Sequence, residues 1–362
     1  MLFVLRMDVR PNLPFCQPEK NALQRGLAFN HTLFSVQPGH ALSGVFAAKR
    51  CPHMQPDARY TKLSAYFRSR FGTRAQKIPL DIGAGCPNRD GVVSTQGCIF
   101  CNLRGSGTGS WKQGLGLERQ WAMWKTRFDK RYADASYIAY LQSFSNTYMP
   151  VPVLRERLDE ICTLPGIAGL AVGTRPDCLD DERLGLVAAC RERLGDEIWL
   201  DLGLQSSNDA TLVRINRGHD FTAWADTCVR AHDAGIKVCV HVVAGLPGED
   251  ASDVLRTVRD ACALPVAGIK FHNLLVVRGS GMVPLWRRGA YEPLAREEYV
   301  DMLCQALPLV PAEVVIHRLH ADPAPGELLA PAWAGEKHAV RNAIEKALEE
   351  RDVRQGSNTV RR

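Results

Sequence analysis

From about Tyr60 onward, short runs of apolar residues alternate with longer stretches whose apolar positions recur every three or four residues. The short runs have the length of β-strands, and the longer stretches have the period of helices that bury one face. The pattern predicts strands over Lys77–Ile82, Ser136–Gln142, Gly169–Gly173, Ile198–Leu204, Lys237–Ala244, Gly268–Val277 and Glu313–His317. It predicts helices over Leu117–Arg131, Val151–Leu164, Asp181–Arg193, Phe221–Ala234, Ala251–Leu264, Arg296–Leu307 and Lys337–Glu350.

This alternation indicates a parallel sheet, because parallel strands need a crossover connection that a helix usually provides. Two runs, Ile198–Leu204 and Lys237–Ala244, are apolar almost throughout, as expected of strands that are covered on both faces. Six or so strand–helix repeats predict an α/β fold whose sheet curls into a closed or partly open barrel.

The same pattern divides the chain into four parts. Residues 1–56 show no sustained period, and we expect them to form a poorly ordered N-terminal extension. We assign the barrel to residues 57–290, a short C-terminal α/β extension to residues 291–350 and a flexible tail to residues 351–362.

Composition and charge narrow the class of protein. The 46% of hydrophobic and 23% of charged residues are ordinary for a globular domain, and no apolar run is long enough to span a membrane. Residues 1–56 contribute +4 and residues 351–362 contribute +3, which leaves −1 for the rest of a chain with a formal net charge of +6. Net charge therefore does not make the barrel a nucleic-acid binder, although local basic patches remain open.

Cysteine usage favours a reduced, cytoplasmic setting. The 12 cysteines are scattered without a disulfide-like framework. The apolar start of the chain is interrupted by Arg6, Asp8 and Arg10, which is unlike a secretory signal.

Candidate functional residues follow the predicted strands. In parallel α/β sheets, chemistry gathers where the strands end. Cys86, Ser143–Thr147, Thr174–Asp177, Gln205 and Gly245–Glu249 come directly after five successive strands. We therefore expect them to meet at one edge of the barrel.

Three cysteines lie in a glycine-rich loop after the first strand. Cys98 and Cys101 have a spacing that lets both bind one metal centre, and Cys86 closes a wider loop. Three thiolates suit an iron–sulfur cluster with one open iron. Structural zinc normally takes four ligands, and no convincing fourth lies nearby, but zinc and the absence of any metal remain alternatives on spacing alone.

At this point the sequence resembles an elongator-type subgroup of the radical S-adenosylmethionine (radical SAM) superfamily. The resemblance rests on the following segments: Cys86-Pro-Asn-Arg-Asp-Gly91, Gly97-Cys-Ile-Phe-Cys-Asn102, Gly173-Thr-Arg-Pro-Asp-Cys178, Leu202-Gly-Leu-Gln-Ser206, Arg214-Ile-Asn-Arg-Gly-His-Asp220 and Gly245-Leu-Pro-Gly-Glu249. It covers roughly residues 60–345. Asp201 is a departure, since the subgroup more often carries Glu there, and residues 1–56 have no counterpart in the family.

The resemblance implies a partial (β/α)6 TIM-like barrel with a short C-terminal α/β extension. It also implies a [4Fe–4S] cluster on Cys86, Cys98 and Cys101 that reductively cleaves SAM to a 5′-deoxyadenosyl radical. The residues that it implies for SAM binding are Gln142, Ser143, Ser145, Asn146, Gln205, Arg217 and Gly245. An amide can bridge ribose hydroxyls, and a guanidinium matches a carboxylate in a bidentate fork.

Charged and imidazole side chains on the later strands are candidates for substrate binding. These are Arg175, Asp177, His241, Lys270, His272 and Arg318. A local ion pair for Arg175 with Asp177 and a satisfied core histidine for His241 are the alternatives. Arg278, Trp286–Arg288, Arg318 and His320 are candidates for a basic, partly aromatic rim.

The resemblance implies two partners: a flavodoxin or ferredoxin-like electron donor, and a tRNA whose wobble uridine is modified. No acetyltransferase segment follows the barrel in this sequence, so we expect the remodelling of an existing modification. A radical enzyme acting on a small metabolite or tetrapyrrole is the alternative within the same class. A non-catalytic, zinc-stabilised nucleic-acid-binding module is the alternative from another class.

Overall fold

Seven parallel strands form one curled sheet in this computed structural model, which describes residues 58–105 and 107–359. The extension expected over residues 1–56 lies outside the described residues. The strand order is β1-β2-β3-β4-β5-β6-β8. The bounds are β1 Ala75–Leu80, β2 Ser136–Leu141, β3 Ile167–Thr174, β4 Ile198–Gln205, β5 Lys237–Ala244, β6 Val266–Asn273 and β8 Val315–Arg318.

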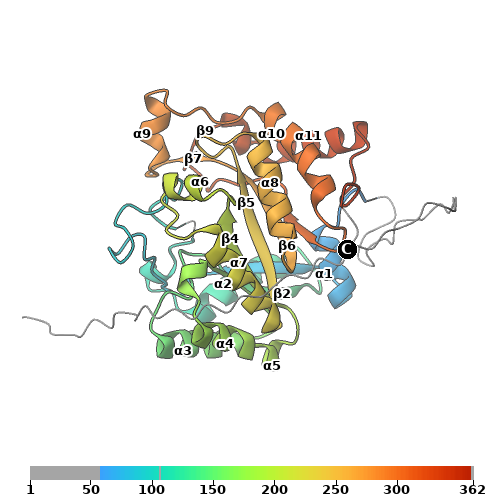
Figure 1. Cartoon of the computed structure of the whole chain (residues 1–362). Coiled ribbons are helices and arrows are strands. Elements are labelled where there is room, and N and C mark those ends of the chain that lie inside the picture. The colour runs from blue at the N-terminus through green and yellow to red at the C-terminus, as the bar shows by residue number, and fades with distance from the viewer. Residues whose placement is uncertain (1–57, 106, 360–362) are drawn as a thin grey trace, which may run out of the picture. The chain divides into compact units, whose positions relative to one another are not determined.

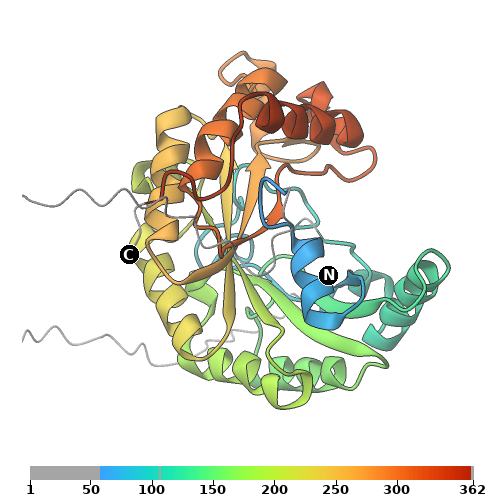
Figure 2. The same cartoon turned by 90° about the vertical axis from the view of Figure 1, so that its right-hand side faces the viewer.

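Helices cover the outer face of the sheet. In Figure 2 the strands converge in the middle of the view and the helices lie around them. Their bounds are α1 Leu63–Phe71, α2 Leu117–Asp129, α3 Val151–Cys162, α4 Asp181–Ala189, α5 Arg191–Leu194, α6 Asp209–Arg214, α7 Phe221–Asp233, α8 Ala251–Cys262, α9 Met282–Arg287, α10 Arg296–Ala306 and α11 Lys337–Glu350. Short 3₁₀ segments occur at Trp111–Gln113, Pro176–Cys178, Leu307–Leu309 and Ala332–Gly335.

This architecture confirms the predicted α/β partial barrel. Every residue of β4 is buried, because helices cover one face and the barrel interior encloses the other. The last predicted strand, which we assigned to the C-terminal extension, pairs in parallel with β6 and extends the main sheet to seven strands.

The run predicted as one strand over Gly268–Val277 divides into two. Strand β6 ends at Asn273, and the next amide, that of Leu274, donates a hydrogen bond to the carbonyl of Ala244. The chain then forms β7 (Val276–Val277), which pairs antiparallel with β9 (Leu328–Ala330) in a small second sheet. Figure 1 shows this pair at the top of the sheet, beside α9.

Helix α1, which the sequence analysis did not predict, closes the end of the barrel where the strands begin. Tyr66 and Phe67 pack there in a cluster of buried residues with Ile138, Ala171, Trp199, Cys239 and Val315. The Tyr66 and Trp199 rings meet edge to face at 5.7 Å, and the Tyr66 hydroxyl donates to Glu197 Oε1 at 2.9 Å. The interior is therefore sealed by aromatic side chains at one end.

Residues 351–359, which we expected in a flexible tail, pack against this closed end. Gln355 is buried, and its Oε1 accepts a hydrogen bond from the amide of Thr61 at 2.8 Å. Its Nε2 donates to the carbonyls of Pro311 at 2.6 Å and Val314 at 2.7 Å. One amide side chain thus joins the last described segment to the first.

None of the helices in the described part of the chain is long and apolar enough to cross a membrane.

Gln355→Ala should destabilise the fold, because it removes the partner of the buried Thr61 amide and one hydrogen bond each from the Pro311 and Val314 carbonyls. We expect a loss of about 2–3 kcal/mol in the free energy of unfolding, measured by urea denaturation. Ser357→Ala, at an exposed position in the same segment, is the matched control. Equal stability of the two variants would show that the segment does not hold the fold.

Candidate functional site

The loop between β1 and α2 carries three cysteines that face one cavity of about 670 Å³. Cys86, Cys98 and Cys101 all line this cavity. The amide of Cys101 donates to the carbonyl of Cys98 at 3.0 Å, so a tight turn joins the last two thiols. Arg89 fixes the loop, since its Nη2 donates to the carbonyls of Cys101 at 3.2 Å and Asn102 at 2.6 Å.

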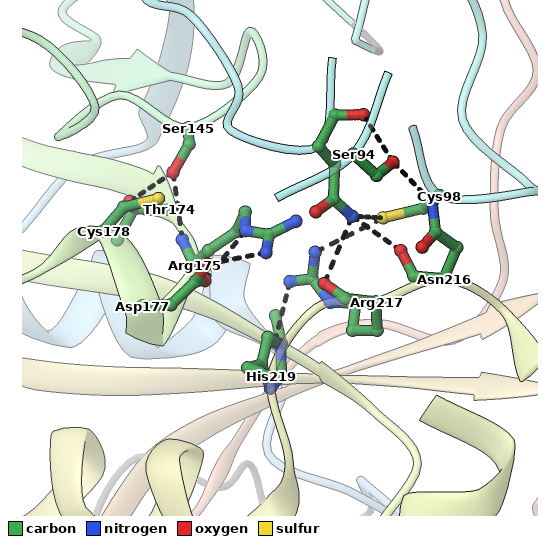
Figure 3. Close-up of polar contacts among 12 residues, drawn as sticks. Ser94, Cys98, Ser145, Thr174, Arg175, Asp177, Cys178, Asn216, Arg217 and His219 are labelled. Atoms are coloured by element: carbon green, nitrogen blue, oxygen red, sulfur yellow. Dashed lines mark hydrogen bonds and ion pairs between the residues drawn. The ribbon is translucent and has the colours of Figure 1, made fainter. Parts of the chain in front are cut away.

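Two donors lie against the sulfur of Cys98. Asn88 Nδ2 lies 3.5 Å from Cys98 Sγ, and Arg217 Nη1 lies 3.7 Å from it. Figure 3 shows Cys98 flanked by Arg217 and Asn216. Burial raises the pKa of the Cys101 thiol, as does the neighbouring Cys98, whereas Arg89 opposes that rise in pKa. Positive charge and N–H donors at this loop stabilise thiolates, which is the form that binds iron.

Gln205 and Arg217 converge over Gly203. A Cβ on Gly203 would come within 2.6 Å of Arg217 Nη2 and 2.8 Å of Gln205 Nε2, so the glycine makes room for both side chains. Arg217 Nη2 donates to the Gly203 carbonyl at 2.9 Å. Both side chains line the cavity, and neither Gln205 Oε1 nor Arg217 Nε has a hydrogen-bond partner among the described residues. These polar atoms are available to a ligand.

The segment after β2 contributes some side chains to the cavity lining and others to contacts with β3. Gln142 and Phe144 line the cavity, whereas Ser143, Ser145 and Asn146 do not. Ser145 Oγ lies 2.9 Å from Thr174 Oγ1, and Asn146 Nδ2 donates to the Gly173 carbonyl at 2.7 Å. These two side chains tie the segment to β3. Phe144 adopts a φ of 53°, and its ring lies directly against Gly105, where an added Cβ would clash with it.

The predicted Gly245 lies away from the cavity lining. Its φ is 82°, and its carbonyl accepts a hydrogen bond from the Tyr291 hydroxyl at 2.8 Å. Val243, two residues earlier in β5, lines the cavity instead.

Arg175 and Asp177 form the local ion pair that was the alternative to a ligand role. Arg175 Nε and Nη2 donate to the two carboxylate oxygens at 2.8 and 2.7 Å. Burial on its own would lower the pKa of Arg175, but the Asp177 carboxylate outweighs it and raises that pKa. Arg175 nevertheless lines the cavity, and its Nη1 has no hydrogen-bond partner among the described residues.

Charged side chains occupy the middle of the barrel, below the cysteine loop. Lys270 Nζ lies 2.5 Å from Asp201 Oδ2 and 3.0 Å from the Tyr140 hydroxyl. His241 Nε2 lies 3.9 Å from Asp201 Oδ1, and the His241 and His272 rings are 5.2 Å apart. Of the predicted substrate residues, Arg175, His241, His272 and Arg318 line the cavity, whereas Asp177 and Lys270 do not.

Desolvation and charge shift the pKa values of this group. Burial raises the pKa of Asp201, but Lys270 and Lys77 overcome it and hold that pKa well below its usual range. Burial, together with Lys270, lowers the pKa of His241 to about 4. Burial also lowers the pKa of Lys77 to about 8. His241 is therefore neutral at physiological pH, and Asp201 is ionised.

Sequence reasoning assigned no role to Lys77, Asn88, Arg89 or Tyr140. Side chains alternate between the two faces of a strand, so Lys77 lies on the same face of β1 as Pro79, which lines the cavity. This alternation could have identified Lys77. For Asn88 and Arg89 the signal was their place inside the cysteine motif. No such signal existed for the Tyr140 hydroxyl, since its partner Lys270 is 130 residues away.

Of the predicted rim, Arg318 alone lines the cavity. Arg278, Arg287 and Arg288 are exposed, Trp286 is half-buried against other apolar residues, and His320 is buried.

The residues that line this cavity fit a [4Fe–4S] cluster and SAM. They supply three thiols to one cavity, with N–H donors at Cys98 and unpartnered polar atoms on Gln205 and Arg217 beside them. An iron–sulfur cluster takes thiolate ligands, and its potential depends on such hydrogen bonds to sulfur.

Comparison with known proteins agrees with this chemistry. The sequence model of the radical SAM superfamily matches residues 81–261, and that of the radical SAM C-terminal domain matches residues 266–350. The uncharacterized protein YtqA of Bacillus subtilis is 37% identical over 305 residues, which cover 84% of this chain and 94% of YtqA.

Two further matches extend this likeness. Elongator complex protein 3 of Schizosaccharomyces pombe is 32% identical over 161 residues, which cover 42% of this chain and 28% of that protein. The solved structure of the archaeal Methanocaldococcus infernus Elp3 with an N-terminal deletion superposes with a TM-score of 0.57 at 17% identity. It covers 68% of this chain and 62% of the archaeal chain, a likeness of fold.

His241→Gln should flatten the pH dependence of stability. The unfolded chain binds a proton at His241 near pH 6.5 and the folded chain only near pH 4, so the wild type loses stability as pH falls between these values. By this linkage, acidification from pH 7.5 to 5 should cost the wild type about 2 kcal/mol more than the variant.

Equilibrium urea unfolding across this pH range measures the difference. His232→Gln, at an exposed position on α7, is the control and should keep the wild-type slope. A His241→Gln variant with the wild-type slope would show that His241 is not buried in its neutral form.

Proposed function

The chain belongs to the radical SAM superfamily, and on this premise we propose that it modifies the wobble uridine of a tRNA anticodon loop. Radical SAM proteins are enzymes that use a [4Fe–4S] cluster and SAM. A non-catalytic zinc module is therefore set aside. The observation that carries the tRNA proposal is the aromatic side chain of Phe144, which lines the cavity and has the cations of Arg89 and Lys112 near its ring.

Cys86, Cys98 and Cys101 are our proposed ligands of the cluster. When bound, the cluster and SAM together supply a 5′-deoxyadenosyl radical that abstracts hydrogen from an unactivated carbon. Asn88 and Arg217 donate toward Cys98 Sγ and thereby stabilise negative charge on the sulfur. Arg89 holds the cysteine loop in place through its hydrogen bonds to the carbonyls of Cys101 and Asn102.

Gln205 and Arg217 are our proposed SAM contacts. The guanidinium of Arg217 would pair with the methionine carboxylate of SAM, and the amide of Gln205 would bind its ribose hydroxyls. Gln142 is the member of its segment that lines the cavity, so we assign it the third contact. Ser145 and Asn146 support this contact indirectly, because they fix the segment to β3.

The closed end of the barrel protects the reacting centre from water. Tyr66, Phe67 and Trp199 pack together over the interior at the end where the strands begin, which limits the entry of solvent between the described residues on that side. A carbon-centred radical needs such exclusion, because water and oxygen divert it.

Phe144 is suited to hold an unstacked base. It lines the cavity, and the Arg89 guanidinium and Lys112 Nζ lie 5.8 and 5.9 Å from its ring centroid. Single-stranded loops of RNA are recognised by stacking on aromatic rings and by cationic contacts to phosphate. Its positive φ is a strained conformation that often marks a ligand-binding residue.

The elongator-type motifs imply the same substrate class. Arg278 and Arg287 are exposed and extend the positive charge available to an RNA backbone. We further propose a flavodoxin or ferredoxin-like protein as electron donor, and a cytoplasmic location.

Anaerobic reconstitution should load about four irons per chain, as a [4Fe–4S] cluster requires. Cys98→Ala should abolish formation of 5′-deoxyadenosine from SAM, measured by chromatography after chemical reduction. Cys262→Ala, which changes a half-buried cysteine on α8, should retain that activity. Stoichiometric zinc without iron uptake would overturn the assignment.

Phe144→Ala should weaken binding of an anticodon stem-loop, because it removes the stacking surface. We expect a loss of about 1–3 kcal/mol, about 5- to 150-fold in Kd, measured by fluorescence anisotropy. Phe71→Ala, on α1 at the closed end, is the control and should bind like the wild type.

Mass spectrometry of tRNA nucleosides from cells with and without the gene completes this test. A changed wobble-uridine derivative supports the proposal. An unchanged profile, together with no tRNA binding, would instead favour a small metabolite or tetrapyrrole as substrate.

A further inference from the structure

The middle of the barrel holds more positive than negative charge. Lys77 and Lys270 come from two strands and lie near one carboxylate, Asp201, and Arg318 pairs in register with Lys270 on the neighbouring strand. The cavity lining contains two other carboxylates, and both are already engaged. Asp322 pairs with Lys337 at 2.8 Å, and Glu327 accepts a hydrogen bond from Asn102 at 2.6 Å.

The single carboxylate is neutralised by one of the three cations. Lys270 lies 2.5 Å from Asp201, within hydrogen-bonding distance. Lys77 Nζ lies 3.9 Å from the same carboxylate and 4.8 Å from the Tyr140 ring centroid, and it has no hydrogen-bond acceptor among the described residues. A buried ammonium without an acceptor is costly, so the surplus charge calls for an anion.

Arg318 presents this surplus to the cavity. It lines the cavity at the end of β8 and forms no side-chain hydrogen bond or ion pair with another described residue. Arg318 is an exposed residue, so its guanidinium is accessible to a carboxylate, which it can bind through two parallel hydrogen bonds.

Two histidines lie in the same lining. His241 and His272 both have an Nε2 atom without a hydrogen-bond partner among the described residues. Burial lowers the pKa of both, so they stay neutral and can donate an N–H without adding charge. Donors of this kind complete the coordination of a carboxylate that already has a cationic partner.

A metal cation is a poorer occupant of this region. Asp201, Cys239 and His317 place potential ligand atoms within 4.8 Å of one another. However, Lys270 already supplies the positive charge at Asp201, and burial raises the pKa of Cys239 and keeps it protonated. A divalent ion there would meet two ammonium groups.

We propose that the substrate carries an acidic group of carboxylate type, which enters the middle of the barrel and binds Arg318, with hydrogen bonds from His241 and His272. The inference rests on the proposed function in taking this cavity as the substrate site. A uridine ring is neutral, so in a tRNA substrate the acid belongs to a substituent already attached to the base.

The test compares an acid with its neutral counterpart on cluster-reconstituted protein. The probes are 5-carboxymethyluridine and its carboxamide as free nucleosides, measured by equilibrium dialysis. The wild type should bind the acid at least about tenfold more tightly than the amide, as expected for a charge-assisted bidentate pair. Arg318→Gln should reduce this preference to within about twofold, and Arg318→Lys should keep part of it.

Arg155→Gln, at an exposed position on α3, is the matched control and should keep the wild-type preference. Titration with SAM identifies the source of the anion, because SAM carries a carboxylate of its own. Arg318→Gln should keep the wild-type SAM affinity, whereas Arg217→Ala should lose it. A loss of SAM affinity in Arg318→Gln, with the acid preference intact, would overturn the inference and assign Arg318 to SAM.

A base-free pair of probes separates this inference from the tRNA proposal. Acetate and acetamide are compared by ¹³C NMR line broadening with the wild type and with Arg318→Gln. Arg318-dependent acetate binding, without binding of either uridine, would reject the tRNA proposal and support the acid site. Equal binding of acid and amide in both pairs would overturn the acid site.

Discussion

The ion pair between Lys270 and Asp201 is the interaction on which the interior of this barrel depends. Barrels of parallel strands usually fill their centre with packed apolar side chains, whereas this one carries charge there. Without Lys270, the buried carboxylate would lack its closest counter-charge. Without Asp201, two ammonium groups would repel each other in a dry setting. Because the pair holds, the space above it can remain a polar cavity.

Much of the fold follows from local pattern. Strand β5 and helix α11 have the predicted bounds, because an apolar run and a helical period are both properties of neighbouring residues. Helix α1 was missed because it is short and polar on average, and its role becomes visible only when Trp199 is placed beneath it. The packing of Gln355 was also missed, because its partner Thr61 is 294 residues away in the sequence.

The candidate site also has a part that the sequence predicts and a part that it does not. The three cysteines share one loop, so their spacing indicated a common centre, and the structure brings them to one cavity. The directions of Ser145 and Asn146 could not be predicted, because they depend on the turn at Phe144 and on acceptors in β3. The charged and imidazole side chains in the interior come from five strands, and sequence alone does not show which of them share a face in register; they are Lys77, Asp201, His241, Lys270, His272 and Arg318. The parallel pairing supplies that information.

Gly203 gives this arrangement a simple signature. A Cβ at that position would come within 2.6 Å of Arg217 Nη2 and 2.8 Å of Gln205 Nε2, so the ends of both side chains would have to move. The residue at position 203 therefore indicates whether the side chains at positions 205 and 217 have this space. Chains that share the cysteine motif can be sorted by this residue before any of them is purified: those with glycine have room for the same pair of side chains in this position, and in those without it the ends of the pair must shift.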